Sequence, residues 1–177
     1  MFESGGSYEW GTPQDLYDDL DAAFGFVLDP AASDKNAKAE FYYTTQEDGL
    51  IMPWRLPEPG AVFVNPPYSR NIGKWLEKAY EEAFGGVTVV MLLSARTDTR
   101  WWHDYVMKAN QIWLIKGRLT FEGADNCAPF PSCIAVFNLR MVEKNAFTYV
   151  KVLPMWKSDD DGWVVDNVPL RDMVWNV

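Results

Sequence analysis

Histidine, cysteine and long apolar runs are scarce in this sequence, and each shortage excludes a class of protein. The 177 residues include one histidine, His103, and two cysteines, Cys127 and Cys133. These three residues are too few for a structural zinc site, so no metal is expected, and the two thiols are expected to be reduced. No apolar run approaches the roughly 20 residues that cross a bilayer, so no membrane partner is expected.

Positive charge is also in short supply. The chain carries 16 basic and 25 acidic residues, which gives a net charge of −9. Long-range attraction therefore does not steer the protein toward DNA or an anionic membrane. A nucleic-acid function would have to use a local basic surface within an acidic whole.

The chain has the length of one ordinary domain. No internal repeat or linker divides the sequence, so we expect a single domain over residues 1–177. Its core is expected at about 9–138, with an extra strand and a loose tail in 139–177. The first residues, MFESGGSYEWGTP, lack the basic and apolar stretches of a secretory signal, so a cytoplasmic protein is expected.

Apolar runs typical of buried strands alternate with amphipathic segments typical of helices. Strands are expected at 26–29, 61–64, 87–93, 111–115 and 133–139, with weaker signals at 41–43 and 148–155. Helices are expected at about 14–24, 72–84 and 100–109, the first with Thr12 as a candidate N-cap and Gly25 as its end. The alternation predicts an α/β fold with a mostly parallel sheet and flanking helices.

Polar residues follow three of these strands directly. The segments are Asp29–Ala32, Asn65–Tyr68 and Ser94–Asp98. In an open parallel sheet, ligands bind outside the carboxyl ends of the strands. We therefore expect the three segments to meet at one edge and to form a binding site there.

The segment Asn65-Pro66-Pro67-Tyr68 suits chemistry on an amino group. The lone pair of a nucleobase amine is delocalised into the ring, and two hydrogen-bond acceptors can draw the nitrogen toward tetrahedral geometry. The Asn65 side-chain oxygen is one acceptor, and the Pro66 carbonyl is the other because the prolines fix the turn. Tyr68 offers a flat face on which a base can stack. The structural alternative is a rigid surface turn.

Other polar residues have two interpretations each. Asp29 could belong to a ligand loop or cap a helix, and Asp48 could bind ribose hydroxyls or punctuate a turn before Gly49. Asp98 is expected to cap the next helix rather than to face the substrate. His103, among aromatic residues, is expected to be packed rather than catalytic.

Seven motifs together resemble one family. EWGTP, LDPAAS, EDGL, VNPPYSRNIGKWLEKA, ARTDTRWWHD, IKGRLTF and APFPS, over about residues 9–138, resemble the phage-type DNA N6-adenine methyltransferases, the Dam-like family of bacteriophages and prophages. The resemblance implies a Rossmann-like, S-adenosylmethionine-dependent methyltransferase sheet and double-stranded DNA as the partner. It also implies a phage or prophage origin and action in a bacterial cytoplasm.

The resemblance also implies roles for residues of this sequence. A flipped adenine would be held by Asn65, Pro66, Pro67 and Tyr68. The cofactor would lie near Trp10, Thr12, Pro13, Asp29, Pro30, Ala31, Asp48 and Asn65. DNA contacts are expected from Arg70, Lys74, Arg96, Thr97 and Arg118. The glycine-rich cofactor loop of larger relatives is absent, and there is little room for a separate DNA-reading domain.

Two other functions remain open at this stage. The segment 65–68 could instead methylate a glutamine amide of a protein, or another amine, since such an amide is also planar. The chain could instead be a non-catalytic acidic phage protein that binds a host factor.

Overall fold

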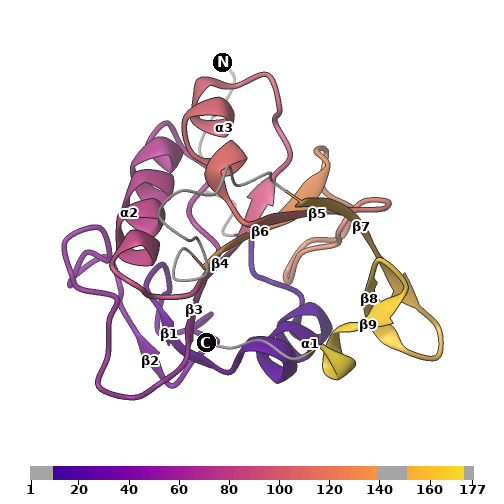
Figure 1. Ribbon diagram of the computed structural model, residues 1–177, viewed down its shortest axis with the longest axis horizontal. Helices are drawn as coiled ribbons and strands as arrows, with labels where there is room; N and C mark the ends of the chain where they lie inside the picture. Colours follow the sequence, from indigo (N-terminus) through magenta and orange to yellow (C-terminus); the bar gives the residue numbers. More distant parts are fainter. Residues whose placement is uncertain (1–9, 139–150, 174–177) are drawn as a thin grey trace.

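A nine-stranded sheet organises the fold in the computed structural model, which describes residues 10–138 and 151–173 (Figure 1). In chain order the strands are β1 (Phe26–Asp29), β2 (Phe41–Tyr42), β3 (Ala61–Val64), β4 (Val89–Ser94), β5 (Gln111–Ile115), β6 (Ser132–Phe137), β7 (Lys151–Ser158), β8 (Gly162–Val165) and β9 (Val168–Pro169). Across the sheet they follow the order β2-β1-β3-β4-β6-β5-β7-β8-β9. The expected strands are present, and the two weaker signals correspond to β2 and β7.

The sheet is mixed, so the expectation of a mostly parallel sheet is wrong. Strands β2, β1, β3 and β4 pair in parallel, as do β5 and β7. Strand β6 is antiparallel to both β4 and β5, and β8 and β9 are also antiparallel to their neighbours. The described connection from β5 to β6 contains no helix, so the chain returns beside β5 in the opposite direction. All six residues of β6 are buried, and such an apolar run looks the same in either direction.

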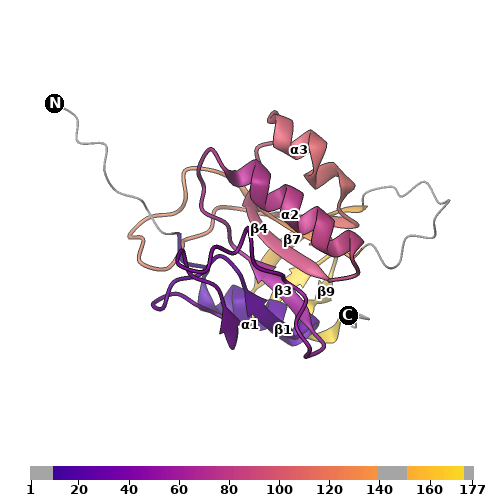
Figure 2. The ribbon, with the colours of Figure 1, turned by 90° about the vertical axis from the view of Figure 1, so that its left-hand side faces the viewer.

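Helices cover the two faces of the sheet. Helix α1 (Gln14–Phe24) lies on one face, and helices α2 (Ile72–Phe84) and α3 (Arg100–Asp104) lie on the other (Figures 1 and 2). Each face has its own core, with Leu16 and Phe24 in one and Trp75 and Leu76 in the other. The apolar stripes of α1 and α2 therefore predicted both helices and their buried sides correctly.

Several local expectations are wrong. Pro13 occupies the N-cap position of α1, so Thr12 does not cap this helix. The third helix is short: α3 ends at Asp104 and a 3₁₀ turn, η1 (Val106–Lys108), follows it. Thr99, not Asp98, is at the N-cap of α3, and its side chain makes no capping hydrogen bond. His103 is exposed rather than packed.

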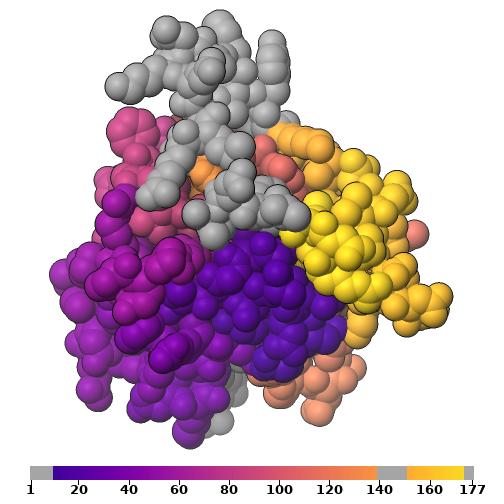
Figure 3. Space-filling view, turned by 60° about the horizontal axis from the view of Figure 1, so that its bottom comes forward, coloured from indigo at the N-terminus to yellow at the C-terminus, as the bar shows by residue number. Residues whose placement is uncertain are grey.

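The described part of the C-terminal region is built into the fold, so the expectation of a loose tail after the extra strand is wrong for the residues up to 173. A 3₁₀ turn, η3 (Leu170–Asp172), follows β9, and Leu170 is fully buried. Asp19 of α1 accepts a hydrogen bond from the Trp163 backbone N–H at 2.7 Å, and Lys157 of β7 pairs with Asp15 at 2.7 Å. Figure 3 shows the C-terminal segment lying directly against α1. The expected strand start at 148–150 and the last residues, 174–177, lie outside the described part.

Two further observations concern the whole described chain. Cys127 is exposed and Cys133 is buried, and both are free. Among the described residues, none of the helices is long and apolar enough to span a membrane.

Candidate active site

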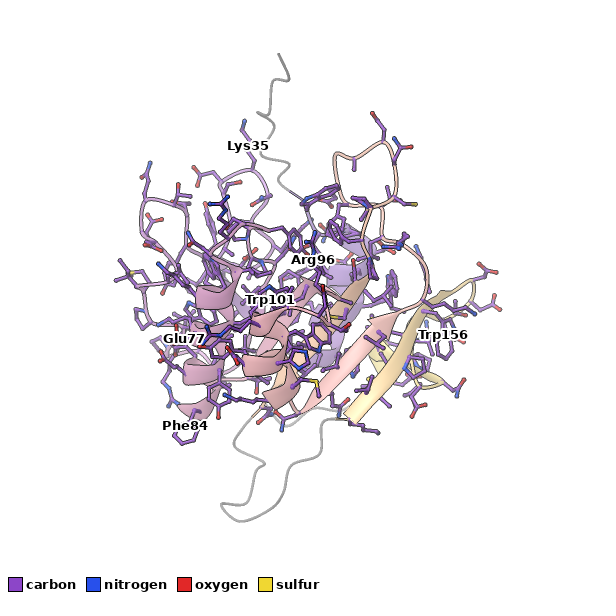
Figure 4. All side chains as sticks on the ribbon, turned by 90° about the horizontal axis from the view of Figure 1, so that it is seen from above. Lys35, Glu77, Phe84, Arg96, Trp101 and Trp156 are labelled. Carbon is purple, nitrogen blue, oxygen red and sulfur yellow. The ribbon has the colours of Figure 1, made fainter. Side chains whose placement is uncertain are left out.

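The loops that follow β1, β3, β4 and β5 gather at one edge of the sheet, called the carboxyl edge below. The first three strands are parallel, and β5 points the same way as β4 because β6 is antiparallel to both. The arm, defined as residues 116–131 between β5 and β6, extends from this edge together with the loops after β1 and β3 (Figure 2). Figure 4 places Lys35 at this edge and Phe84, the last residue of α2, at the opposite edge. The three polar segments therefore do converge.

Asn65, the first residue after β3, is held by the segment that precedes α1. Its Nδ2 donates hydrogen bonds to the Trp10 carbonyl at 2.5 Å and to Thr12 Oγ1 at 3.1 Å. Its Oδ1 is buried and has no hydrogen-bond partner among the described residues. The amide therefore uses its donor end for the fold and keeps its acceptor end unpaired. An acceptor in that state can receive an N–H group of a ligand.

Two other buried oxygens share this property and this location. Within residues 10–138 and 151–173, the buried side-chain atoms without a partner are Ser33 Oγ, Asn65 Oδ1 and Ser132 Oγ. Ser33 lies in the loop after β1, and Ser132 begins β6, where it pairs with Ser94 at the end of β4. Buried polar groups are nearly always hydrogen-bonded, so such atoms call for an explanation. All three lie at the carboxyl edge, as expected if a ligand completes their hydrogen bonds.

Four aromatic rings, called the aromatic cluster below, pack beside Asn65. They are Trp10, Tyr68, Phe121 and Phe130. The Tyr68 ring centroid lies 5.3 Å from that of Phe130, and the Trp10 centroid lies 5.3 Å from Phe121 and 5.6 Å from Phe130. Phe121 and Phe130 come from the arm. Sequence reasoning assigned them no role, although both stand in quoted motifs, because only the folded arm brings them to Tyr68.

The Tyr68 hydroxyl points inward. It donates a hydrogen bond to the Leu92 carbonyl at 3.4 Å, and burial raises its pKa above the ordinary value. The ring is therefore held neutral and fixed at its far end. Tyr68 can contribute a face for stacking but not a proton-transfer group.

Two cavities of the described structure lie away from Asn65. One cavity of about 230 Å³ lies at the opposite edge, lined by Trp54, Arg55 and Gly60 among others, and a second of about 250 Å³ lies beside α2 at Lys74. Neither is lined by Asn65. Trp10, Asn65, Tyr68 and Phe130 are each partly exposed. Solvent therefore reaches part of the aromatic cluster and part of the Asn65 side chain at the carboxyl edge.

The turn Pro66-Pro67 leaves one carbonyl as the second acceptor. The Pro67 carbonyl accepts the Ser69 N–H at 2.8 Å. Pro66, which is buried between Asn65 and the exposed Pro67, is thus the candidate for the acceptor role expected from the sequence.

The Asp29 carboxylate supports the loop after β1 instead of capping a helix. It accepts the N–H groups of Ala31 and Lys38, each at 3.3 Å. Burial raises its pKa to about 6, although these two hydrogen bonds and the Lys38 charge act in the opposite direction. Pro30 is packed closely, since a Cβ on Gly49 would lie 1.9 Å from the Pro30 carbonyl oxygen. These contacts set the shape of the loop around Pro30 and Ala31.

Asp48 lies after β2, which is parallel to β1, so it is near the same edge. Its φ of 58° is in the left-handed region, and its carboxylate accepts the Leu50 N–H at 3.0 Å. The turn role is therefore present. The ribose-binding role stays a prediction.

The residues expected to contact DNA are exposed. They are Arg70, Lys74, Arg96, Thr97 and Arg118. All but Lys74 belong to loops of the carboxyl edge, and Figure 4 shows Arg96 between this edge and Trp101. Lys74 lies on α2, on a surface that it shares with Glu77, Lys78 and Glu81. In the described part of the chain, no group of histidine, cysteine and acidic side chains could hold a metal ion.

Comparison with known proteins agrees with the motifs. A model of the family described as DNA N-6-adenine-methyltransferase (Dam) matches residues 6–152. The chain is 32% identical over 112 residues to the DNA N-6-adenine-methyltransferase of Escherichia phage T1. The aligned region covers 63% of this chain and 46% of that protein. It is 28% identical over 115 residues to the protein of the same name from Haemophilus phage HP1. That aligned region covers 63% of this chain and 65% of the phage protein.

A shorter match of 64 residues, at 42% identity, relates the chain to the putative methyltransferase YfdM of Escherichia coli strain K12, covering 34% of this chain and 70% of that protein. The chain therefore spans less than two thirds of the two phage proteins. The family match, in contrast, covers well over half of this chain. The resemblance drawn from the motifs is confirmed: the chain belongs to the DNA N-6-adenine-methyltransferase (Dam) family.

Proposed function

We propose that this protein transfers a methyl group from S-adenosylmethionine to the exocyclic amine of a flipped adenine in double-stranded DNA. Its family membership supports this proposal, and one structural observation carries it: the buried, unpaired Oδ1 of Asn65 beside the aromatic cluster. An amide oxygen in that state is an acceptor for an N–H group, and the rings match the flat shape of a base.

The residues around Asn65 would bind the adenine amine and orient its lone pair. Asn65 Oδ1 accepts one N–H of the adenine amine, and the Pro66 carbonyl accepts the other. Both acceptors weaken the overlap of the nitrogen lone pair with the ring. Tyr68 and Phe130 hold the base by stacking, so that the lone pair keeps one direction. The new N–C bond would form as the methyl–sulfur bond breaks, which leaves S-adenosylhomocysteine, and the methylated amine would then lose one proton to water. A neutral amide is sufficient, because no proton has to be removed before the N–C bond forms.

The residues at the carboxyl edge fit the cofactor. When bound, S-adenosylmethionine supplies a methyl group that is already activated by its sulfonium charge. The unpaired Ser33 Oγ lies in the loop after β1, where open α/β sheets bind such ligands. We assign Ser33, the backbone of Pro30 and Ala31, and the Asp48 carboxylate to cofactor binding. Asp29 holds the loop through Ala31 and Lys38.

The DNA contacts would come from a narrow basic rim. Arg70, Arg96 and Arg118 follow β3, β4 and β5, so their loops lie along one edge around Asn65. Lys38, in contrast, is unavailable to phosphate because its ammonium pairs with Glu122 at 2.8 Å. With a net charge of −9, contacts outside this rim would be repelled. The adenine has to leave the duplex to reach Asn65, at a cost of a few kcal/mol.

The direct test incubates the purified full chain with tritiated S-adenosylmethionine and either duplex DNA or a cell protein extract. We expect label in DNA, recovered as N6-methyladenine after nuclease digestion. Label in protein but not in DNA would favour the glutamine or other amine activity. Failure to bind the cofactor by calorimetry would contradict the proposal and favour a non-catalytic protein.

A further inference from the structure

We propose that the strap, defined as residues Trp10, Gly11 and Thr12, is a positioning element that sets the orientation of the Asn65 amide. This inference rests on the proposed function, because the orientation matters only if Oδ1 has to receive a substrate amine. The strap lies close to the start of α1 and contacts Asn65 and the arm.

The geometry of the two hydrogen bonds selects one of the two amide orientations. The Trp10 carbonyl can only accept, so it pairs with Nδ2 and would repel Oδ1. Thr12 Oγ1 lies 3.1 Å from the same Nδ2 and satisfies its second N–H. Rotating the amide by half a turn would place Oδ1 against the Trp10 carbonyl and turn a donor toward the substrate amine. Only the observed orientation presents an acceptor to that amine.

The Thr12 hydroxyl is available to the Asn65 amide because Thr12 does not cap α1. Its side chain is buried, and Pro13 holds the N-cap position instead. A threonine before proline at the start of a helix would ordinarily be assigned to the helix. Here its hydroxyl is directed to the residue that follows β3.

The arm also contacts the strap, through a hydrogen bond to Gly11. Glu122 donates its N–H to the Gly11 carbonyl at 2.7 Å, and a Cβ on Gly11 would lie 3.0 Å from Glu122 Cβ. The Lys38 ammonium contacts both Glu122 carboxylate oxygens, at 2.8 and 2.9 Å, and Gln14 Oε1 at 2.7 Å. The side chain of Lys38 is only 8% exposed. One buried cation therefore joins the loop after β1, the start of α1 and the arm around the strap.

The proposal is tested with Thr12→Val, which keeps the shape of the side chain and removes the acceptor. Thr12→Ser restores the hydroxyl. Thr88→Val is the matched control, since Thr88 is equally buried at the opposite edge of the sheet. We expect kcat to fall roughly 3- to 10-fold in Thr12→Val, as for the loss of one hydrogen bond, with KM for DNA and Kd for the cofactor unchanged. Thr12→Ser is expected to recover most of the loss.

A second readout needs no activity. In protein labelled with ¹⁵N-asparagine, the Asn65 side-chain signals are assigned by their loss in Asn65→Ser. We expect both Nδ2 protons of the unmodified chain to exchange slowly with solvent. In Thr12→Val one of them should shift and exchange faster, and in Thr88→Val neither should change.

Each outcome has a defined meaning. Unchanged Asn65 signals and unchanged kcat in Thr12→Val would overturn the proposal. A raised cofactor Kd with unchanged Asn65 signals would also overturn it and make Thr12 a cofactor contact. If the unmodified chain methylates no DNA, the proposed function fails, while the Asn65 signals still decide whether the strap orients the amide.

Discussion

The two edges of the same sheet differ in how their polar groups are hydrogen-bonded. The opposite edge contains a cavity of about 230 Å³, yet its polar groups are paired: Arg55 donates to the Gly85 carbonyl, and the Trp54 N–H donates to Glu82. The carboxyl edge has Ser33, Asn65 and Ser132 with buried unpaired oxygens. The proposed site is therefore placed by unsatisfied polar atoms and not by open space. Unsatisfied polar atoms beside partly exposed rings are the better indicator.

Removing the Asn65 acceptor should have the largest effect. In Asn65→Ala, we expect kcat to fall roughly 10²- to 10³-fold, as for loss of one donor or acceptor aimed at a reacting group. The cofactor Kd should stay within a factor of about two, because the side chain acts on the amine. Arg55→Ala, at the cavity edge, is the matched control and should leave kcat unchanged. Comparable losses in both variants would remove the distinction between the edges.

The Asp29 carboxylate should make the carboxyl edge sensitive to pH. Its pKa is raised from 3.8 to about 6 by burial, so the folded state binds the proton more tightly than the unfolded state. The free energy of unfolding therefore decreases as the pH rises from about 4 to about 6, by at most about 3 kcal/mol for a shift of two pKa units. Above about pH 6 the Asp29 carboxylate is charged, and its burial lowers the free energy of unfolding by the full amount.

Asp29→Asn should remove most of this dependence. Its amide oxygen can still accept one N–H, and it carries no buried charge. Urea unfolding of both proteins at pH 4, 5, 6 and 7 measures the difference, with the exposed Asp98→Asn as control. A difference that grows toward low pH would have the wrong sign and would contradict the burial of the Asp29 charge.

Loss of a ring from the aromatic cluster should weaken base binding. For Tyr68→Ala and Phe130→Ala, we expect kcat/KM to fall about 5- to 100-fold, which corresponds to roughly 1–3 kcal/mol for stacking one base. Tyr68→Phe should retain stacking, because the hydroxyl contacts only the Leu92 carbonyl in the described structure. Phe84→Ala, an exposed ring at the opposite edge, is the control. Equal activity of Phe130→Ala and the unmodified chain would exclude the arm from the base site.

The smallest expected effect concerns the basic rim. Arg96→Ala and Arg118→Ala should each lower the slope of log K against log salt by about 1, as for loss of one phosphate contact. The control is Lys151→Ala, an exposed cation at the start of β7, where the strand leaves the opposite edge. Fluorescence anisotropy with duplex DNA at several salt concentrations measures the slopes. An equal decrease in Lys151→Ala would indicate binding by overall charge rather than by the rim.

Local patterns were enough for some features and not for others. The stripe from Ile72 to Ala83 predicted α2, and the apolar run 61–64 followed by Asn65-Pro66-Pro67-Tyr68 predicted β3 and a turn after it. Both depend on spacing within a short segment. The direction of β6 could not be predicted, because a strand buried on both faces has no polarity in its pattern. The expected helix cap at Thr12 was wrong, because its local context suited a cap, whereas in the fold its hydroxyl accepts a hydrogen bond from Asn65.

The amino-acid sequence by itself determined the strands β1 and β3 to β6, the helices α1 and α2, the turn after β3, and the family to which the chain belongs. The tertiary structure alone decided that Phe121 and Phe130 stand beside Tyr68, that Thr12 and the Trp10 carbonyl orient the Asn65 amide, and that β7–β9 pack against the rest. The physical reason is distance along the chain. Propensity and periodicity act within a few residues, whereas the pairing of Asn65 with Trp10, 55 residues apart, exists only after the sheet has formed.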